Sequence, residues 1–372
     1  SSCVQYWKCP ENVDFATDIT TPIREFQFAL NDLLFRKGLA FPVSEGERWL
    51  GFALLVGDHY RSLIRYPMSK NNTPVVDIVR AIFGDASVFI AREINPLASM
   101  GTAGTTDFAD HLITDVDVTL TPQAPFRTTG VYALPGETVT VTRTDDSDLV
   151  VRLKVHSIRT NSNAPFRNLY DRPIFLSSRQ LRIDPGETLR FTSAHGGPIH
   201  AFFGTSDEDV SFEFENVGQH PVWRGPEDST AFVNALKSTD FSWAEFVTPY
   251  FEVHAQRAKM VQVFYRSYAN TPSDLSDMID VYIRDWPHWL AGWEGPGISE
   301  NPDLQAFAEA HGLTIPVIDL VKHMNSDRPS CNSSAPNCTG SSGNPYDASW
   351  IFDPISIGDL HELGHGLEFR AR

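Results

Sequence analysis

Three side chains near the end of the sequence have the types and the spacing of a metal-dependent hydrolase. His361, Glu362 and His365 stand in GDLHELGHGLEFRAR, residues 358–372. On a helix, His361 and His365 lie one turn apart on one face, so two imidazole nitrogens can bind one zinc ion. Glu362 lies about 100° around the same helix. From there it can reach a metal-activated water and act as general base without binding the metal itself.

The leucines between and around these residues predict a helix with a side that faces the core. Leu360, Leu363 and Leu367 fall on a different face from the histidines. A helix that carries histidines on one face and leucines on another can present a metal site while it packs against the rest of a domain. The alternative is a surface helix whose histidines stand four apart by chance.

A tetrahedral zinc site needs a third protein ligand, and only residues 366–372 follow the second histidine. Glu368 continues the histidine face, but three ligands from one short helix would leave poor tetrahedral angles. We therefore expect Glu368 to support the ligands or to face the solvent. The expected third ligand lies in the remainder of the catalytic domain, beyond Arg372, so that the chain holds an incomplete active site.

Length and composition limit the possible classes of protein. The 372 residues are too many for one ordinary core, and a hydrophobic fraction of 41% suits two or three folded domains. The 47 acidic and 30 basic side chains give a formal charge of -17. Such a surface repels phosphate backbones and anionic lipids, which argues against nucleic-acid and membrane-surface partners. No run approaches the roughly 18 apolar residues of a membrane span.

The four cysteines fall in two local pairs, Cys3 with Cys9 and Cys331 with Cys338. The second pair lies in a polar loop rich in Ser, Asn, Pro and Gly, where nothing apolar would bury a free thiol. We predict two disulfides and therefore an exported protein that is secreted, periplasmic or at the cell surface. The alternative, a four-cysteine metal site, fits less well because neither pair has the short gap of a zinc knuckle.

Three segments with different patterns of apolar and polar residues follow one another along the chain, and together they predict a multidomain α+β protein. Residues 1–110 are expected to form a helical domain, because apolar stripes between residues 19 and 95 are punctuated by Gly, Pro and Asn. Residues 111–222 contain short alternating runs rich in Val, Thr and Phe, which predict an antiparallel β-sandwich. Residues 223–372 contain both helix-like and strand-like patterns and are expected to form the first part of an α+β catalytic domain.

Seven runs in the middle third have the alternation of strands: DVDVTLTP, TTGVYALP, ETVTVTRT, LVVRLKVHS, ETLRFTS, IHAFF and DVSFEFENV. The phrase PGET precedes two of them, at residues 135–138 and 185–188, and predicts a turn followed by the start of a strand. In the final third, residues 241–256 predict a short turn leading into one strand, and residues 271–292 predict a helix with a Thr-Pro-Ser start.

Other candidate site residues precede the histidine motif. Trp289 and Trp293, together with Trp286, could form an aromatic platform for a sugar or a peptide, although packing in the core is the commoner use of tryptophan. Glu245, in the stretch SWAEF, could contact substrate or could be structural. Trp289, Trp293 and Glu245 are the predicted substrate-binding positions.

Several stretches together resemble a known family. GDLHELGHGLE, NPYDASWIF, SWAEF with the strand that follows it, and TTGVYALPGETVTV resemble the enhancin-type (M60-like) zinc metallopeptidases, and among them the bacterial secreted immunomodulating metalloprotease type. The resemblance covers roughly residues 115–372, and the helical first hundred residues carry no sign of it.

This resemblance implies a gluzincin-like catalytic domain preceded by a β-sandwich. It implies hydrolysis of peptide bonds in mucin-like O-glycosylated proteins, with His361 and His365 as zinc ligands and Glu362 as catalytic base. The family's third ligand is a Glu downstream of the motif and has no counterpart here. The alternative function is that of a glycan-binding or adhesion protein in which the zinc site is incomplete or vestigial.

Overall fold

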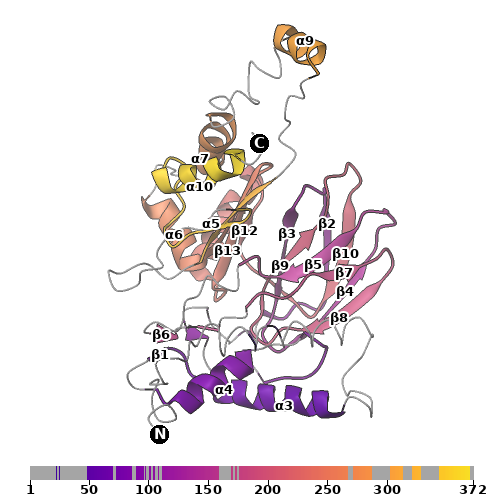
Figure 1. Ribbon diagram of the computed structural model, residues 1–372, viewed down its shortest axis with the longest axis vertical. Coiled ribbons are helices and arrows are strands. Elements are labelled where there is room, and N and C mark those ends of the chain that lie inside the picture. The colour runs from indigo at the N-terminus through magenta and orange to yellow at the C-terminus, as the bar shows by residue number, and fades with distance from the viewer. Residues whose placement is uncertain are drawn as a thin grey trace. The chain divides into compact units, whose positions relative to one another are not determined.

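The described part of the chain falls into two compact units. The computed structural model describes residues 48–69, 73–85, 89–95, 111–158, 172–173, 176–266, 271–286, 302–312, 321–327 and 343–368, with a few isolated positions between them and the backbone alone at 364–368. Unit 1 comprises residues 1–122, 128–220 and 240–242. Unit 2 comprises residues 123–127, 221–239 and 243–372. Figure 1 follows the elements of both along the chain.

Two helices, α3 (Arg48–Leu63) and α4 (Val75–Asp85), are described in the N-terminal part of unit 1. The buried positions of α3 recur mostly at intervals of three and four, as on one face of a helix. A Cβ on Gly84 would lie 2.9 Å from the Arg61 backbone nitrogen, so a glycine allows α4 to approach α3 closely. These two helices confirm part of the helical prediction for residues 19–95.

Most of the other described elements of unit 1 are short antiparallel strands. One sheet has the order β2-β10-β4-β8, with β2 (Val116–Leu120), β10 (Val210–Glu215), β4 (Thr138–Arg143) and β8 (Thr188–Thr192). A second has the order β11-β3-β9-β5-β7, with β11 (Gly218–Gln219), β3 (Phe126–Ala133), β9 (Gly197–Phe202), β5 (Val151–Val155) and β7 (Leu181–Ile183). A separate antiparallel pair joins β1 (Met68–Ser69) to β6 (Leu169–Tyr170).

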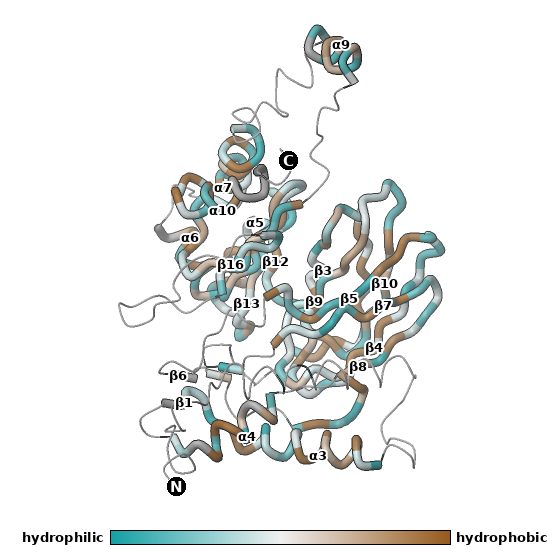
Figure 2. Tube along the Cα trace, in the orientation of Figure 1, coloured by the Kyte–Doolittle hydropathy of each residue, from teal (hydrophilic) through white to brown (hydrophobic). Residues whose placement is uncertain are grey.

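Both sheets of unit 1 contribute to a single hydrophobic cluster. In β4, Val139 and Val141 are buried and alternate with half-buried threonines. Phe212 and Phe214 of β10 enter the same cluster from the first sheet, and Leu153 of β5 enters it from the second. Figure 2 shows the corresponding change between hydrophilic and hydrophobic colour along these strands. All seven runs that the sequence predicted as strands contain one, because alternation follows the two-residue period of a half-buried strand.

The repeated PGET phrase forms the same turn in both copies. Gly136 and Gly186 have φ of 84° and 70°, a conformation that glycine adopts without steric cost. The Glu137 nitrogen donates to the Leu134 carbonyl at 3.2 Å, and the equivalent bond after Gly186 measures 2.9 Å. The following strands, β4 and β8, begin at the threonines of the two phrases and pair with each other. The predicted turn followed by a strand is confirmed twice.

Unit 2 is built around a five-stranded sheet with the order β12-β13-β14-β15-β16. The strands are β12 (Val222–Trp223), β13 (Trp243–Val247), β14 (Phe251–Gln256), β15 (Lys322–Ser326) and β16 (Tyr346–Asp347). Only β13 and β14 are antiparallel to each other, and the other neighbouring pairs are parallel. The described helices of this unit are η6 (Pro226–Asp228), α5 (Ser229–Ser238), α6 (Arg257–Arg266), α7 (Pro272–Ile279), η7 (Asp280–Asp285), α9 (Pro302–Ala310) and α10 (Ile357–Glu368).

One face of this sheet is apolar and packs against helices. Its cluster takes side chains from the strands and from α5, α6, α7 and α10, which contribute Phe232, Met260, Leu275 and Leu363 among others. Figure 1 shows these helices gathered beside the strands of unit 2. Alternate residues of the strands therefore point either into this cluster or to the opposite face.

The structure corrects the prediction for residues 241–256, which form two strands rather than a turn and one strand. The Thr248 nitrogen donates to the Phe251 carbonyl at 2.9 Å and closes a tight hairpin between β13 and β14. All five residues of β13 are buried. Because both faces of β13 are covered, the polar alternation that would have revealed a strand is weak.

The predicted helix over residues 271–292 is confirmed as far as Trp286, and residues 287–292 lie outside the described part. It begins as expected, because the Thr271 side chain accepts a hydrogen bond from the Asp274 nitrogen at 3.2 Å. The helix continues from α7 into the π-helix η7. Among the described residues, no helix combines the length and the apolar character needed to cross a bilayer. The division into domains at residues 110 and 222 stays a prediction.

A buried ion pair lies at the end of β4. Arg143 has no exposed surface, and its Nη2 donates to Asp145 Oδ1 at 2.9 Å. The same arginine donates to the carbonyl of Ile183 in the other sheet at 3.3 Å. Burial would raise the pKa of Asp145, but hydrogen bonds from Arg143, Ser211 and Ser147 outweigh it and lower the pKa to about 2.

We expect Asp145→Asn to destabilise unit 1 at neutral pH, because it leaves the Arg143 charge buried without its partner; the expected loss is about 3 kcal/mol. The pKa of Asp145 is lower in the folded state than in the unfolded state. The wild type is therefore more stable than the variant above about pH 4, and this difference in the free energy of unfolding is lost as the pH falls toward 2. Urea unfolding of both proteins across this range measures the effect. The control is Asp184→Asn, which removes an exposed pair with Arg182 and should change little. A constant difference between Asp145→Asn and wild type at every pH would contradict the assignment.

Candidate active site

The histidine motif lies on α10, and the predicted helix is confirmed over residues 357–368. Ser356 immediately precedes it. The Asp359 nitrogen donates to Ser356 Oγ at 3.0 Å, and Ser356 Oγ donates to Asp359 Oδ2 at 2.8 Å. This reciprocal pair resembles a capping box and satisfies an N–H group that the first turn of a helix leaves without a backbone partner.

Asp359 also ties the motif helix to the sheet. The hydroxyl of Tyr346, on β16, and the indole nitrogen of Trp350 both donate to Asp359 Oδ1 at 2.9 Å. The Asp353 nitrogen donates to Oδ2 at 3.0 Å. The Asp359 side chain has no exposed surface. The stretch NPYDASWIF therefore acts by holding the start of the helix in place.

Burial affects both members of the Tyr346–Asp359 pair. Burial raises the pKa of Asp359 to about 6, although hydrogen bonds from Asp353, Trp350 and Ser356 favour its charged form. Burial also raises the pKa of Tyr346, and the nearby charges of Asp359 and Glu362 raise it further. The tyrosine therefore remains a hydrogen-bond donor.

The residues of the motif differ in their exposure to solvent around α10. His361 is exposed, Glu362 is 8% exposed, and Leu363 packs in the apolar cluster of unit 2. Among the described residues, no hydrogen-bond partner reaches Glu362 Oε2. The side chain of His365 lies outside the described part. A buried carboxylate oxygen with no hydrogen-bond donor beside it is suited to a water molecule or a metal-bound group.

The leucine face of the helix was predicted only in part. Leu363 is buried, but Leu360 is 36% exposed, so its prediction as a core residue was wrong. The hydrogen bonds of Asp359 turn that residue inward, and the buried face is centred on Asp359, Glu362 and Leu363. Leu360 follows Asp359 by about 100° around the helix and falls at the edge of this face. The side chain of Leu367 lies outside the described residues.

Imidazoles of His361 and His365, one helical turn apart, fit a zinc-type ion by the chemistry of their donor atoms. The buried oxygen of Glu362 fits the role of a base beside it. Tyr346, Trp350 and Asp359 position the motif helix through their hydrogen bonds, a role that the sequence analysis missed. Two signals were present: these residues stand in stretches that carry the family resemblance, and Asp359 is an acidic residue three positions after a serine at the start of an apolar stretch.

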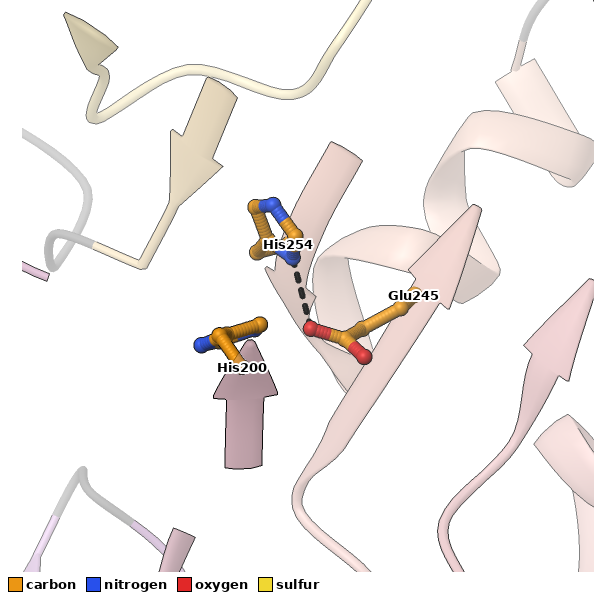
Figure 3. A group of neighbouring side chains, drawn as sticks. All are labelled: His200, Glu245 and His254. Atoms are coloured by element: carbon orange, nitrogen blue, oxygen red, sulfur yellow. Dashed lines mark hydrogen bonds and ion pairs between the residues drawn. The ribbon is translucent and has the colours of Figure 1, made fainter. Parts of the chain in front are cut away.

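Glu245, a predicted substrate-binding residue, has no exposed surface. It lies on β13, and its Oε1 is 2.6 Å from His254 Nδ1 on β14; Figure 3 shows this contact as a dashed line. Burial favours the structural reading of this glutamate. The other predicted positions lie outside the described residues: Trp289, Trp293, Cys3, Cys9, Cys331 and Cys338.

We expect Asp359→Asn to destabilise unit 2 by about 1–3 kcal/mol, because an amide turns a donor toward groups that donate to the carboxylate. Tyr346→Phe removes one of these hydrogen bonds and should cost about 1 kcal/mol. Urea unfolding of the single variants and of the double variant measures the coupling between them. Asp303→Asn, a matched change at an exposed position in the first turn of α9, serves as the control. Full stability of Asp359→Asn would show that Asp359 does not anchor the helix.

Comparison with known proteins adds two matches at the level of sequence. A family model for the immunomodulating metalloprotease helical domain matches residues 1–93. The sequence analysis found no family resemblance in this region, and that statement was wrong. The immunomodulating metalloprotease of Pseudomonas aeruginosa is 26% identical over 339 residues, which cover 85% of this chain and 36% of the relative. The chain therefore spans little more than a third of that protein.

Solved structures share the fold. IMPa from Pseudomonas aeruginosa in complex with an O-glycopeptide has a TM-score of 0.78 at 24% identity, covering 99% of this chain and 43% of that one. IMPa metallopeptidase in complex with T-antigen has a TM-score of 0.77 at 23% identity, covering 96% of this chain and 42% of that one. The mixed α+β fold with a helical N-terminal region is thus common to both proteins. The sequence matches and the shared fold make this chain similar to the immunomodulating metalloprotease, and they support a relationship to the M60-like metallopeptidases.

Proposed function

We propose that this chain carries part of the active site of a zinc endopeptidase that cleaves O-glycosylated, mucin-like proteins. The observation that carries the proposal is the state of Glu362, which is buried on a helix anchored by Asp359 and has a carboxylate oxygen without a described hydrogen-bond partner. His361 lies beside it on the solvent side, and His365 follows one turn later. Two histidines one turn apart with a carboxylate beside them are the residue types that a zinc-dependent hydrolase uses for its metal and its base.

His361 and His365 would hold the zinc ion. When bound, zinc supplies Lewis-acid polarisation of the scissile carbonyl and lowers the pKa of a water molecule. Glu362 takes a proton from the attacking water as the water oxygen bonds to the carbonyl carbon. When the peptide C–N bond breaks, Glu362 delivers that proton to the leaving nitrogen. Because Oε2 of Glu362 has no described hydrogen-bond partner, little competes with this transfer.

The substrate class rests on the relatives. One similar structure is a complex with an O-glycopeptide and another a complex with T-antigen. We infer that a glycan on the substrate helps to select the cleaved bond here too. The third zinc ligand stays a prediction, a Glu downstream of the motif.

The β-sandwich, the export of the protein and its two disulfides are also proposals. We infer that the two antiparallel sheets of unit 1 form the predicted β-sandwich, since one hydrophobic cluster draws on both. Export and the two disulfides rest on the cysteine spacing. The alternative glycan-binding function depended on Trp286, Trp289 and Trp293. Trp286 is 49% exposed, and the other two lie outside the described residues, so this alternative stays a prediction.

In the protein that contains this chain, Glu362→Gln should lower the rate of O-glycopeptide cleavage by about 10²–10⁴-fold, because it removes the base and leaves the metal ligands in place. Mass spectrometry of a glycosylated peptide and of its unglycosylated match measures cleavage, and a chelator assay measures zinc. Zinc content should stay unchanged.

Glu208→Gln, at an exposed loop position of unit 1, is the matched control and should cleave like wild type. Undiminished cleavage by Glu362→Gln would rule out this mechanism. Equal cleavage of the two peptides by the wild type would rule out selection by the glycan.

A further inference from the structure

A second group of metal-binding side chains lies on the sheet of unit 2. Glu252 and His254 stand two apart on β14 and point to the same face. His323 on β15 is in register with Glu252, and Glu245 on β13 is in register with His254. All four residues are at most 1% exposed. The strand pairing therefore brings two carboxylates and two imidazoles together on one buried face.

Three atoms of this group form a triangle of the size that a bound metal requires. His254 Nε2 lies 3.0 Å from His323 Nδ1, and Glu252 Oε2 lies 3.7 Å and 3.6 Å from these two nitrogens. A triangle with these sides has its corners about 2.0 Å from one common point, which matches the bond lengths of zinc to imidazole and carboxylate. Little movement is needed to seat an ion.

The surrounding residues fix each of these groups in a suitable state. Glu245 Oε1 accepts a hydrogen bond from His254 Nδ1 at 2.6 Å, which leaves the lone pair of His254 on Nε2, the atom that forms one corner of the triangle. A carboxylate behind a histidine is the usual outer partner of a zinc-binding imidazole. Arg127 Nε lies 2.9 Å from Glu252 Oε1, so the other oxygen, Oε2, faces the histidines. The ring of Phe126 stacks on His323 with centroids 3.6 Å apart and holds its plane.

We propose that Glu252, His254 and His323 form a second metal site, for a zinc-type divalent cation, with water as the fourth ligand. The ligand set suits zinc because imidazole and carboxylate are its common donors beside thiolate. His323 binds through Nδ1 and then carries its proton on Nε2. The bound ion joins β14 to β15, and its role is structural because the ligands are buried.

This site is independent of the histidine motif. Phe251, Val253 and Met324 alternate with the three ligands along β14 and β15 and lie in the apolar cluster, and Leu363 of the motif helix packs into that same cluster. The proposed metal site lies on the opposite face of the sheet. Either site can therefore be removed without touching the other.

Without metal, the same residues form a hydrogen-bonded network. His323 Nδ1 would then donate to His254 Nε2, and the charges of Arg127 and Arg224 act on the two carboxylates. The balance of charge does not itself require a cation. The inference rests on the triangle and on the orientation of its three atoms.

The experiment starts from the full chain with both motif histidines removed, His361→Ala with His365→Ala, so that zinc at the motif does not contribute. Zinc content after dialysis, and zinc affinity by competition with a chromogenic chelator, are measured on this protein. We expect about one zinc ion per chain, the amount that a single site holds. Adding His323→Ala should abolish binding, and adding Glu245→Gln should weaken it by about 10–100-fold. His311→Ala, an exposed change after α9, is the matched control and should leave binding unchanged.

X-ray absorption at the zinc edge of the motif-deficient protein gives a readout that needs no further variant. Scattering from two imidazoles and from oxygen is expected. The proposal is overturned if this protein is folded by circular dichroism but binds no zinc at micromolar concentration. It is also overturned if the bound zinc shows sulfur ligands or fewer than two imidazoles. If His323→Ala prevents folding, the absorption spectrum decides.

Discussion

The motif helix depends on one buried carboxylate, that of Asp359. Burying a carboxylate is costly unless donors surround it. Tyr346, Trp350, Ser356 and the Asp353 nitrogen supply those donors, and they come from the edge strand β16, from the chain after it and from the helix start. Once these bonds are made, the rotation of α10 about its axis is set. Glu362, three residues later, then lies on the buried side, and His361 lies on the side of the solvent.

The sheet of unit 2 also has two different sides, because alternate residues of each strand point to an apolar face and to a polar face. The apolar face receives the helices, including Leu363 of the motif helix. The opposite face carries buried acids and histidines, which need polar partners from one another and from Arg127 because no apolar neighbour can satisfy them. Glu245 and Glu252 meet His254 and His323 for this reason. The same two-residue period thus builds the apolar face that supports the motif helix and the buried polar face that carries the proposed second metal site.

The sequence predicts those features of the structure whose pattern lies within a few neighbouring residues, and it fails for features that join residues far apart in the chain. The strands of unit 1 were predicted because their alternation is local, as with Val139 and Val141 in β4. The strand β13 was missed because both its faces are buried. His254 and His323 are 69 positions apart, and only the parallel pairing of β14 with β15 brings them together. Asp359 was overlooked because an acid in the first turn of a helix usually complements the helix dipole at the surface.

The N-terminal helices show a different limit. Reasoning from motifs looks for side chains that can do chemistry, and the sequences of α3 and α4 offer mainly apolar stripes and scattered charges, of which only the structure shows that Arg61 and Asp85 are buried. Such stripes satisfy the packing needs of almost any helical domain, so they carry little information about family when they are read one at a time. A family model weighs every position together and matches residues 1–93. Chemistry-bearing residues therefore point to a function from a few positions, whereas a packing unit is recognised only from the whole pattern of its sequence.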